Sequence, residues 1–252
     1  MKLNPLTAID FYKADHRRQY PEGTTLVYSN FTPRSAKLSN VPEHLFDNRV
    51  VFFGLQHFVK HFLIDMWNAE FFGKPKAEVV AKYRRRMDTS LGAGAIPVGH
   101  IEALHDLGYL PICIKALPEG SLVPIKVPVL VIYNTHPDFF WLTNYLETVL
   151  SCCLWKPMTS ATVARHYRKL LDRYADETGT DKGFVQFQAH DFSFRGLSGP
   201  EDAALSGAAH LTSFVGTDTV PAIDLLEDYY GGDAEKELLW SSQRMVDSRK
   251  AV

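Results

Sequence analysis

The sequence predicts an α/β protein, and the strongest indication lies between residues 184 and 230. Two apolar, β-prone runs, 184–189 and 211–215, each precede a turn with polar and aromatic side chains. Small residues at 202–210 predict a helix between them, and 222–230 predict a second helix. Strand, helix and strand in this order form a β-α-β unit, in which ligand-binding residues follow the carboxyl ends of the strands.

The preceding part of the chain also alternates strands and helices, and this favours an α+β domain before the β-α-β unit. Gly179 is a typical helix stop, so the loop at 179–183 predicts a boundary between domains 1–179 and 180–239. A capping box is expected at the next helix, with Ser198 as N-cap, Pro200 in the first turn and Glu201 at N3. The expected strands before this boundary are 25–31, 112–116 and 127–133, the helices are 51–72, 77–89, 141–150 and 159–178, and a last short helix is expected at 234–239.

Composition excludes several classes of protein. The chain has 252 residues, 46% of them hydrophobic, and a net charge of −2, so the basic footprint of a nucleic-acid binder is missing. Arg84–Arg86 fit the solvated face of a helix. No apolar run approaches the ~20 residues that span a bilayer, and no signal peptide is visible. The three cysteines, Cys113, Cys152 and Cys153, suit buried thiols, so we expect a cytoplasmic protein without nucleic-acid or membrane partners.

The two turns carry the chemistry of a binding site. An aromatic face at Phe192 or Phe194 can stack on a flat ring, and Arg195 offers a fork of donors for a carbonyl, carboxylate or phosphate. Asp218 can accept from an amide or from ribose hydroxyls. The alternative is structural: both phenylalanines belong to the core, Arg195 pairs with Asp191, and Asp218 caps the next helix. A metal pair at His57 and His61 lacks an acidic third ligand in any known pattern, so we expect ordinary packing there and assign no protein metal ligand.

Several motifs occur together in one order. The two turns read His-Asp-Phe-x-x-Arg-Gly at 190–196 and Gly-Thr-Asp-Thr-Val at 216–220, with Ser-Gly-Ala-Ala-His-Leu at 206–211 between them. The chain resembles the nicotinamide phosphoribosyltransferase family in these motifs, and the resemblance fades near Leu239. Further matching segments are 10–16, 27–34, 53–56, 108–111, 115–120 and 141–144.

The resemblance implies a reaction and the roles of six residues. Family members join nicotinamide to 5-phosphoribosyl 1-pyrophosphate, with Mg²⁺ accompanying the sugar substrate, to give nicotinamide mononucleotide and pyrophosphate in NAD salvage. It also implies a homodimer, in which a second subunit completes the pocket. By resemblance Phe192 stacks on one face of nicotinamide and Tyr12 of the second subunit on the other, Asp218 binds the carboxamide, Arg195 contacts the amide oxygen and a nearby phosphate, Asp10 lies at the shared pocket, and Arg34 reaches toward the phosphates. We therefore take Asp218, Arg195 and Asp10 as the candidate catalytic residues.

Asp218 also bears on the choice of base. A nicotinate carboxylate about 4 Å from an ionised Asp218 would be repelled by several kcal/mol at an effective dielectric of ~20, whereas an amide NH2 would be a good donor. This favours nicotinamide over nicotinic acid. At position 194 the chain has Phe where the family often has Tyr, so a ring hydroxyl is missing there.

The chain departs from the family pattern after Leu239. The resemblance implies a barrel-like α/β domain, but a complete barrel takes ~200 residues or more, so we expect only its first β-α units in a truncated chain. Residues 240–252 form a polar segment that does not match, and a family histidine in a Glu-His-Ser context is missing. We expect little turnover by this chain alone. The alternatives are a subunit completed by another chain, an inactive fragment that dimerises with or regulates a full-length relative, and a bare nicotinamide-binding module.

Overall fold

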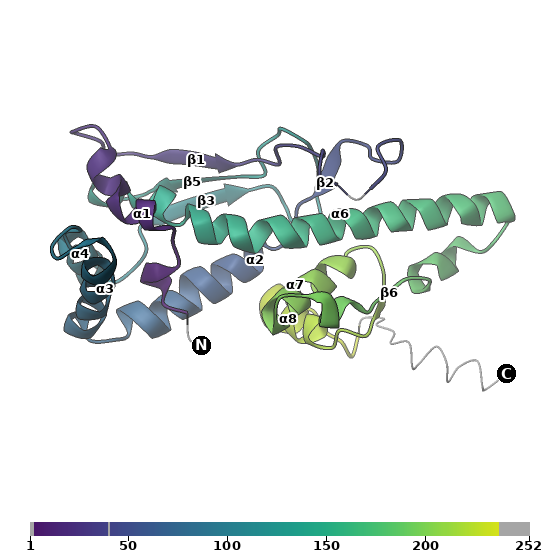
Figure 1. Ribbon diagram of the computed structural model, residues 1–252. Helices are drawn as coiled ribbons and strands as arrows, with labels where there is room; N and C mark the ends of the chain where they lie inside the picture. Colours follow the sequence, from purple (N-terminus) through teal and green to yellow (C-terminus); the bar gives the residue numbers. More distant parts are fainter. Residues whose placement is uncertain (1–2, 40, 237–252) are drawn as a thin grey trace. The chain divides into compact units, whose positions relative to one another are not determined.

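The computed structural model describes residues 3–39 and 41–236. They form two compact units, each built from separate stretches of chain (Figure 1). The first unit comprises Met1–Phe31, Phe58–Ala116 and Pro128–Cys152, and the second comprises Thr32–His57, Leu117–Val127 and Cys153–Val252. Residue 180, where the sequence predicts a second domain, lies inside the second unit. Helices and strands occur in both, and the predicted α/β class is confirmed.

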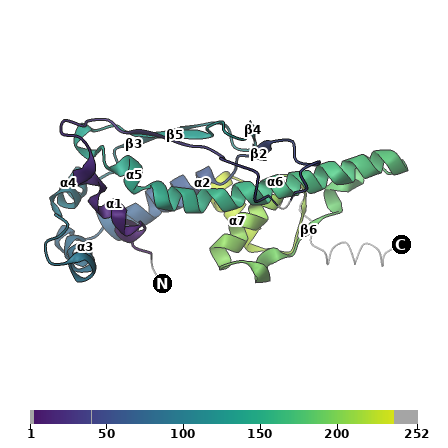
Figure 2. The same ribbon diagram turned by 45° about the horizontal axis from the view of Figure 1, so that its top comes forward.

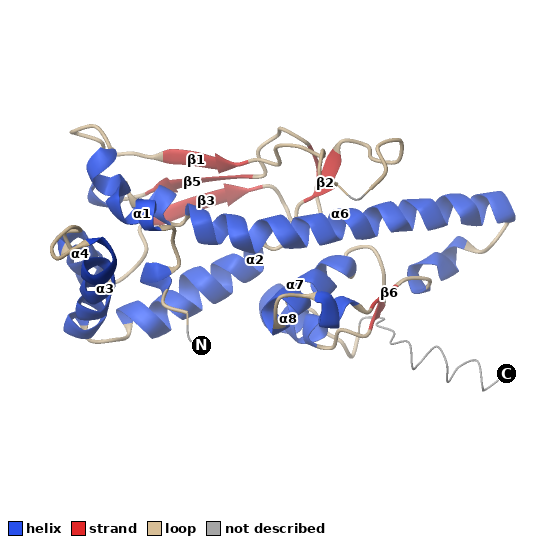
Figure 3. Cartoon of the chain, viewed as in Figure 1, coloured by secondary structure: helices blue, strands red, loops and turns tan. Residues whose placement is uncertain are grey.

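A three-stranded antiparallel sheet organises the first unit. Its order is β1 (Tyr28–Phe31), β5 (Leu130–Asn134) and β3 (Ile112–Ala116), and Figure 3 shows the three as neighbouring arrows. Tyr28 pairs with Tyr133, and Ile112 pairs with Asn134. Burial alternates along the central strand β5, whose residues 130, 132 and 134 are buried, so one face of the sheet covers the core. The prediction for β3 is confirmed at both ends.

The other two strands begin three residues later than predicted, for local reasons. The Asn134 side chain accepts from the Val27 N–H at 2.8 Å and donates to the Thr25 carbonyl at 2.8 Å. A side chain therefore takes the place of strand pairing before Tyr28. At β5, Val127 N–H donates to the Pro124 carbonyl in a turn, and Pro128 has no N–H to offer a ladder.

Helices complete the first unit. The predicted helix at 77–89 is confirmed as α3 (Lys76–Leu91), which buries Val79, Val80, Tyr83 and Met87 at helical spacing and leaves Arg84–Arg86 exposed. Helices α1 (Phe11–His16) and α4 (Gly99–Leu107) were not predicted. The remaining helical segments are η1 (Pro5–Thr7), η2 (Arg17–Gln19), η3 (Phe58–Met66), η4 (Asn68–Phe72), η5 (Pro137–Phe139) and α5 (Leu142–Tyr145).

The predicted helix at 51–72 is wrong at its start. Val51 ends β2 (Arg49–Val51), which pairs antiparallel with β4 (Leu122–Pro124) in the second unit. The two strands are labelled next to each other in Figure 2. Gly54 then takes φ +110°, and helix α2 (Leu55–His57) begins after it. The Glu119 carboxylate accepts from the N–H groups of Gly54 and Gln56, each at 2.6 Å, and from the Tyr230 hydroxyl at 3.0 Å. A carboxylate distant in sequence thus fixes where this helix begins.

A single long helix, α6 (Glu147–Thr178), replaces most of the two helices predicted at 141–150 and 159–178. Pro157 lies inside it, and a Cβ added to Gly54 would lie 2.8 Å from Pro157 Cγ, so the ring packs against a glycine. The predicted stop is confirmed: Gly179 takes φ +68°, and Thr180 N–H donates to the Ala175 carbonyl at 2.9 Å.

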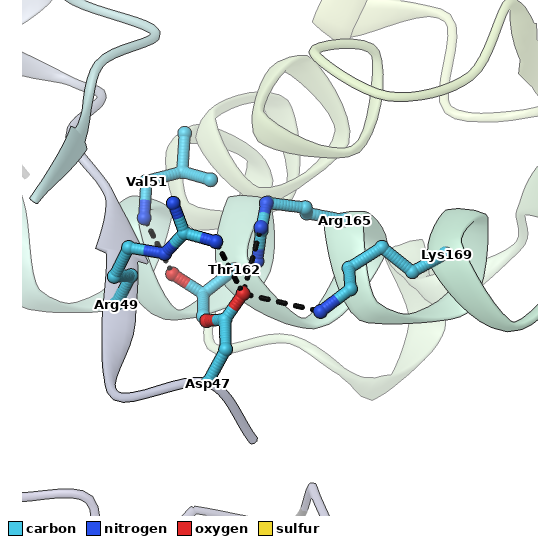
Figure 4. Close-up of polar contacts among 6 residues, drawn as sticks. All are labelled: Asp47, Arg49, Val51, Thr162, Arg165 and Lys169. Atoms are coloured by element: carbon cyan, nitrogen blue, oxygen red, sulfur yellow. Dashed lines mark hydrogen bonds and ion pairs between the residues drawn. The ribbon is translucent and has the colours of Figure 1, made fainter. Parts of the chain in front are cut away.

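A cluster around Asp47 fastens β2 to α6 in the second unit (Figure 4). One Asp47 carboxylate oxygen accepts from Arg165 at 2.8 Å, Arg49 at 2.9 Å and Lys169 at 3.1 Å. Burial acts to raise the pKa of Asp47, but these three hydrogen bonds outweigh it and hold the pKa well below its ordinary value. The Val51 N–H also donates to the Thr162 hydroxyl at 2.9 Å. Side chains of α6 therefore hold β2 in place on the side where no third strand pairs with it in the described sheet.

The predicted helices of the β-α-β region are confirmed as α7 (Pro200–His210) and α8 (Pro221–Tyr230). The small residues of α7 are buried from Ala203 to Ala209 and pack against α8. A Cβ added to Gly207 would lie only 2.7 Å from Ala222 Cβ. The two helices therefore depend on a glycine at their contact.

The predicted strands at 184–189 and 211–215 are wrong in position. Asp181 caps η6 (Lys182–Phe187) by accepting from the Gly183 N–H at 2.9 Å, so this run coils. Residues 212–214 donate back to carbonyls at the end of α7 and prolong its last turn. The strands are β6 (His190–Asp191) and β7 (Gly216–Thr217), which pair in parallel.

Beyond α8, residues 234–236 form a turn. The rest of the helix predicted at 234–239 and the polar segment 240–252 lie outside the described residues. Within the described part of the chain, no helix combines the length and apolar character that crossing a membrane requires.

Replacing Gly207 with Ala tests the contact between α7 and α8. Glycine to alanine inside a helix ordinarily stabilises by about 1 kcal/mol. Here the new methyl would overlap Ala222, so we expect a net loss of about 1–3 kcal/mol in the free energy of unfolding. Urea unfolding followed by circular dichroism measures it. Gly99→Ala is the control, because a Cβ there meets no atom within 4 Å. Equal stability of the two variants would contradict the close contact.

Candidate active site

Two turns lie side by side at the ends of the parallel strands of the second unit. Asp191 pairs with Thr217 in the register, so Phe192 and Asp218 are the next residues along neighbouring strands. The Asp218 N–H donates to the Asp191 carbonyl at 2.9 Å and extends the pairing by one step. Neighbouring strands lie about 4.8 Å apart, so the two residues leave the sheet close together. The prediction that Phe192, Arg195 and Asp218 follow strand ends is therefore correct, although the strands occupy the first two residues of each predicted turn.

The first turn presents its aromatic side chains to solvent. Phe192 is 65% exposed and Phe194 is 40% exposed. The alternative that places both rings in the core is wrong. Phe192 is the residue between β6 and η7 (Ser193–Gly196), a single 3-10 turn that contains Phe194. An exposed Phe face next to polar groups can stack on a flat ligand.

Arg195 lies on the same turn and is exposed. The alternative pairing with Asp191 is not formed, because the Asp191 carboxylate accepts from the Ser193 N–H at 3.0 Å and from the Thr219 hydroxyl at 2.6 Å. Within residues 3–39 and 41–236, no acidic side chain forms an ion pair with Arg195. Its guanidinium is therefore available to an anionic or carbonyl ligand.

Asp218 occupies the second turn and its side chain is 23% exposed. The alternative that it caps the following helix is wrong: Val220 is the N-cap of α8, and no side chain hydrogen bond caps that helix. One Asp218 carboxylate oxygen lies 4.0 Å from Nδ1 of His190, whose side chain is 9% exposed. A Cβ added to Gly216 would lie 2.8 Å from the His190 ring, so Gly216 allows the imidazole to lie beneath the turn.

The capping box predicted for α7 is not formed. Gly199, and not Ser198, is the N-cap, and no side chain caps the helix. The Ser198 N–H donates to Asp202 at 2.9 Å, and the same carboxylate oxygen accepts from Lys156 at 3.0 Å. Pro200 begins the helix as expected. The chain between the two turns is thus held by an acidic residue in the first turn of α7.

Asp10 and Tyr12 belong to the first unit. Tyr12 is 52% exposed on α1, and the Lys13 ammonium lies 4.9 Å from the centre of its ring. Lys13 is buried and forms an ion pair with Glu147, while the Asp10 carboxylate accepts from the neighbouring Thr148 hydroxyl at 2.7 Å. These contacts fasten α1 to the start of α6 and leave the Tyr12 ring accessible.

Arg34 lies in the second unit beside a groove of about 870 Å³, away from the regular elements. It is exposed, and two other cations, Lys37 and Lys126, line the same groove. The structure therefore places Asp218 beside Phe192, with Arg195 on the turn that follows Phe192, and it places Arg34 on a separate segment of the unit. Asp191, which holds the two turns, was missed as a site residue because its sequence context suggested an ion pair.

Two family models match the chain. The nicotinamide phosphoribosyltransferase N-terminal domain matches residues 4–74, and the nicotinate phosphoribosyltransferase (NAPRTase) family matches residues 187–237. The second match contains both turns of the candidate site. Among solved structures, the crystal structure of human nicotinic acid phosphoribosyltransferase resembles the chain with a TM-score of 0.58 and 21% identity, covering 86% of this chain and 37% of the human one. That likeness concerns the fold alone.

Curated relatives carry the same name as the first family model. The nicotinamide phosphoribosyltransferase of Acinetobacter baylyi is 64% identical over 229 residues, which cover 91% of this chain and 45% of the relative. That of Xanthomonas campestris pv. campestris is 34% identical, covering 90% of this chain and 45% of the relative. This chain spans about half the length of these relatives. The family models, together with 64% identity to a curated relative along most of this chain, show that the chain belongs to the nicotinamide phosphoribosyltransferase family.

Proposed function

We propose that the protein is a nicotinamide phosphoribosyltransferase of NAD salvage, and that its two turns form the base-binding part of the site. The observation that carries the proposal is the exposed Phe192 ring beside Asp218 at the ends of paired strands, with the exposed Arg195 on the same turn as Phe192. Exposure of a large aromatic face is unfavourable in water, and a stacked pyridine ring would cover it.

The base would lie flat on Phe192, with its carboxamide toward Asp218. An ionised carboxylate accepts from the amide NH2 but repels a nicotinate carboxylate, so Asp218 would select the amide. Arg195 would donate to the amide oxygen or to a phosphate of the sugar substrate. One matching family is named for nicotinamide and the other for nicotinate. We propose that residue 218 selects between these two bases.

The sugar substrate in this proposal is 5-phosphoribosyl 1-pyrophosphate bound with Mg²⁺. Arg34 would bind the phosphates of this substrate, because Arg34 is exposed and other cationic side chains line the groove beside it. Tyr12 would stack on the second face of the base from another subunit of a homodimer, which suits its exposure on α1. Asp10 would act at the same shared pocket. A protein that binds the base without transferring the sugar is the alternative.

Removing the Phe192 ring tests base binding. We expect Phe192→Ala to weaken nicotinamide binding at least about tenfold in calorimetry, because the stacked surface is lost. Phe184→Ala is a matched control, since Phe184 is 48% exposed in the same unit but lies on η6. Equal affinity in both variants would contradict stacking on Phe192.

The charge of Asp218 tests base choice. We expect the unaltered chain to bind nicotinamide at least about tenfold more tightly than nicotinate, and Asp218→Asn to narrow this ratio by removing the repulsion. Asp224→Asn on α8 changes the same charge at an exposed position and should leave the ratio unchanged. A ratio that is insensitive to Asp218 would place base selection elsewhere.

Product formation separates a transferase from a binding protein. The purified chain would receive nicotinamide, 5-phosphoribosyl 1-pyrophosphate and Mg²⁺, with nicotinamide mononucleotide followed by chromatography. Any turnover should fall at least about tenfold in Asp218→Ala, because a charged hydrogen bond to the base is lost. Nicotinamide binding without turnover would limit the function of this chain to base binding.

A further inference from the structure

The two turns are joined by one buried hydrogen bond. Asp191 is the last residue of β6, and its carboxylate accepts from the Thr219 hydroxyl, on the turn after β7, at 2.6 Å. Its other oxygen accepts from the Ser193 N–H at 3.0 Å, inside the first turn. Asp191 is 8% exposed and Thr219 is fully buried. One carboxylate therefore holds the residue after Phe192 and the residue after Asp218.

Both partners are themselves fixed. The Thr219 N–H donates to the Thr217 hydroxyl at 3.0 Å, so the hydroxyl that meets Asp191 comes from a closed turn. Helix α7 covers the pair: a Cβ added to Gly207 would lie 3.0 Å from the Asp191 carboxylate and 3.2 Å from Thr219 Cγ2. Burial beneath a helix makes this charged hydrogen bond stronger than one in water.

We infer that the Asp191–Thr219 pair consists of positioning residues, which set the separation between the Phe192 ring and the Asp218 carboxylate. The inference rests on the proposed function, because it takes nicotinamide as the molecule that fits between the Phe192 ring and the Asp218 carboxylate. Asp191 does not touch the base in this scheme, because it is buried beneath α7 and its two oxygens are hydrogen-bonded to the turns themselves. It acts through the two turns, which carry the exposed Phe192 ring and the partly exposed Asp218 carboxylate.

The reason lies in what stacking and amide recognition require together. A ring placed on Phe192 can slide along that face at little cost, so only the distance to Asp218 fixes where the carboxamide falls. The backbone pairing ends at the Asp218 N–H, which leaves the turns beyond it without further ladder bonds. The Asp191–Thr219 hydrogen bond is the next link after that point among the described residues.

Thr219→Val tests the pair without changing side-chain volume much, and Thr219→Ser restores the hydroxyl. Thr159→Val is the matched control, because Thr159 donates to a backbone carbonyl on α6 at 2.8 Å. Hydrogen exchange followed by mass spectrometry measures the opening of the backbone amides in both turns and needs no ligand. We expect Thr219→Val to speed exchange about tenfold in both 192–197 and 218–221, while Thr219→Ser and Thr159→Val stay near the unaltered chain. Faster exchange at 218–221 alone, or in neither segment, would overturn the inference.

Nicotinamide calorimetry on the same proteins separates positioning from simple support of the fold. We expect about tenfold weaker binding in Thr219→Val at a temperature where circular dichroism shows the variant to be folded, and recovery in Thr219→Ser. Unaltered affinity in Thr219→Val despite coupled exchange would overturn the positioning role. If the unaltered chain binds no nicotinamide while both segments exchange faster, the proposed function fails, and the link between the turns stands on the exchange result.

Discussion

The second unit depends on the close approach of α7 to α8 and to the strand ends. Gly207 makes it possible, because its missing side chain leaves room for Ala222, Asp191 and Thr219 at once. Small residues along α7 then bury a continuous face, so a short helix without strong amphipathic character becomes part of the core. Both strands of the parallel pair have only two residues each. The helix packing, more than strand length, therefore keeps the two turns in register.

Local patterns were sufficient where the chain itself supplies the signal. Strand β3 and helices α3, α7 and α8 follow from residue patterns along the chain, and the stop at Gly179 follows from a glycine, which takes a positive φ there. Boundaries were missed where a side chain distant in sequence decides them. Asn134 takes the place of strand pairing before Tyr28, and Glu119 holds the first N–H groups of α2. The run 184–189 was missed for a local reason, because the Asp181 side chain caps a 3-10 helix that begins at Lys182.

The site was predictable in part for the same reason. Strand, turn and helix in sequence place side chains at a strand end, and this was enough to bring Phe192 beside Asp218. The role of Asp191 was not visible, because a neighbouring arginine suggests an ion pair and only the fold reveals Thr219 as the partner. Its one signal is the Thr-Asp-Thr order of 217–219, which offers two hydroxyls beside a parallel strand. The roles given to Asp10, Tyr12 and Arg34 came from family resemblance, and they remain predictions.

The interleaving of the two units has a consequence for synthesis. Residues 28–31 find their strand partner only at 130–134, and residues 49–51 find theirs at 122–124 and in α6. Neither unit can close from a continuous stretch of chain, so the early segments leave the ribosome before their partners exist. Long loops of this kind slow folding, since their closure entropy precedes the contacts that offset it. During that interval the β1 and β2 segments lack their strand partners, and unpaired strand edges are prone to associate with other chains.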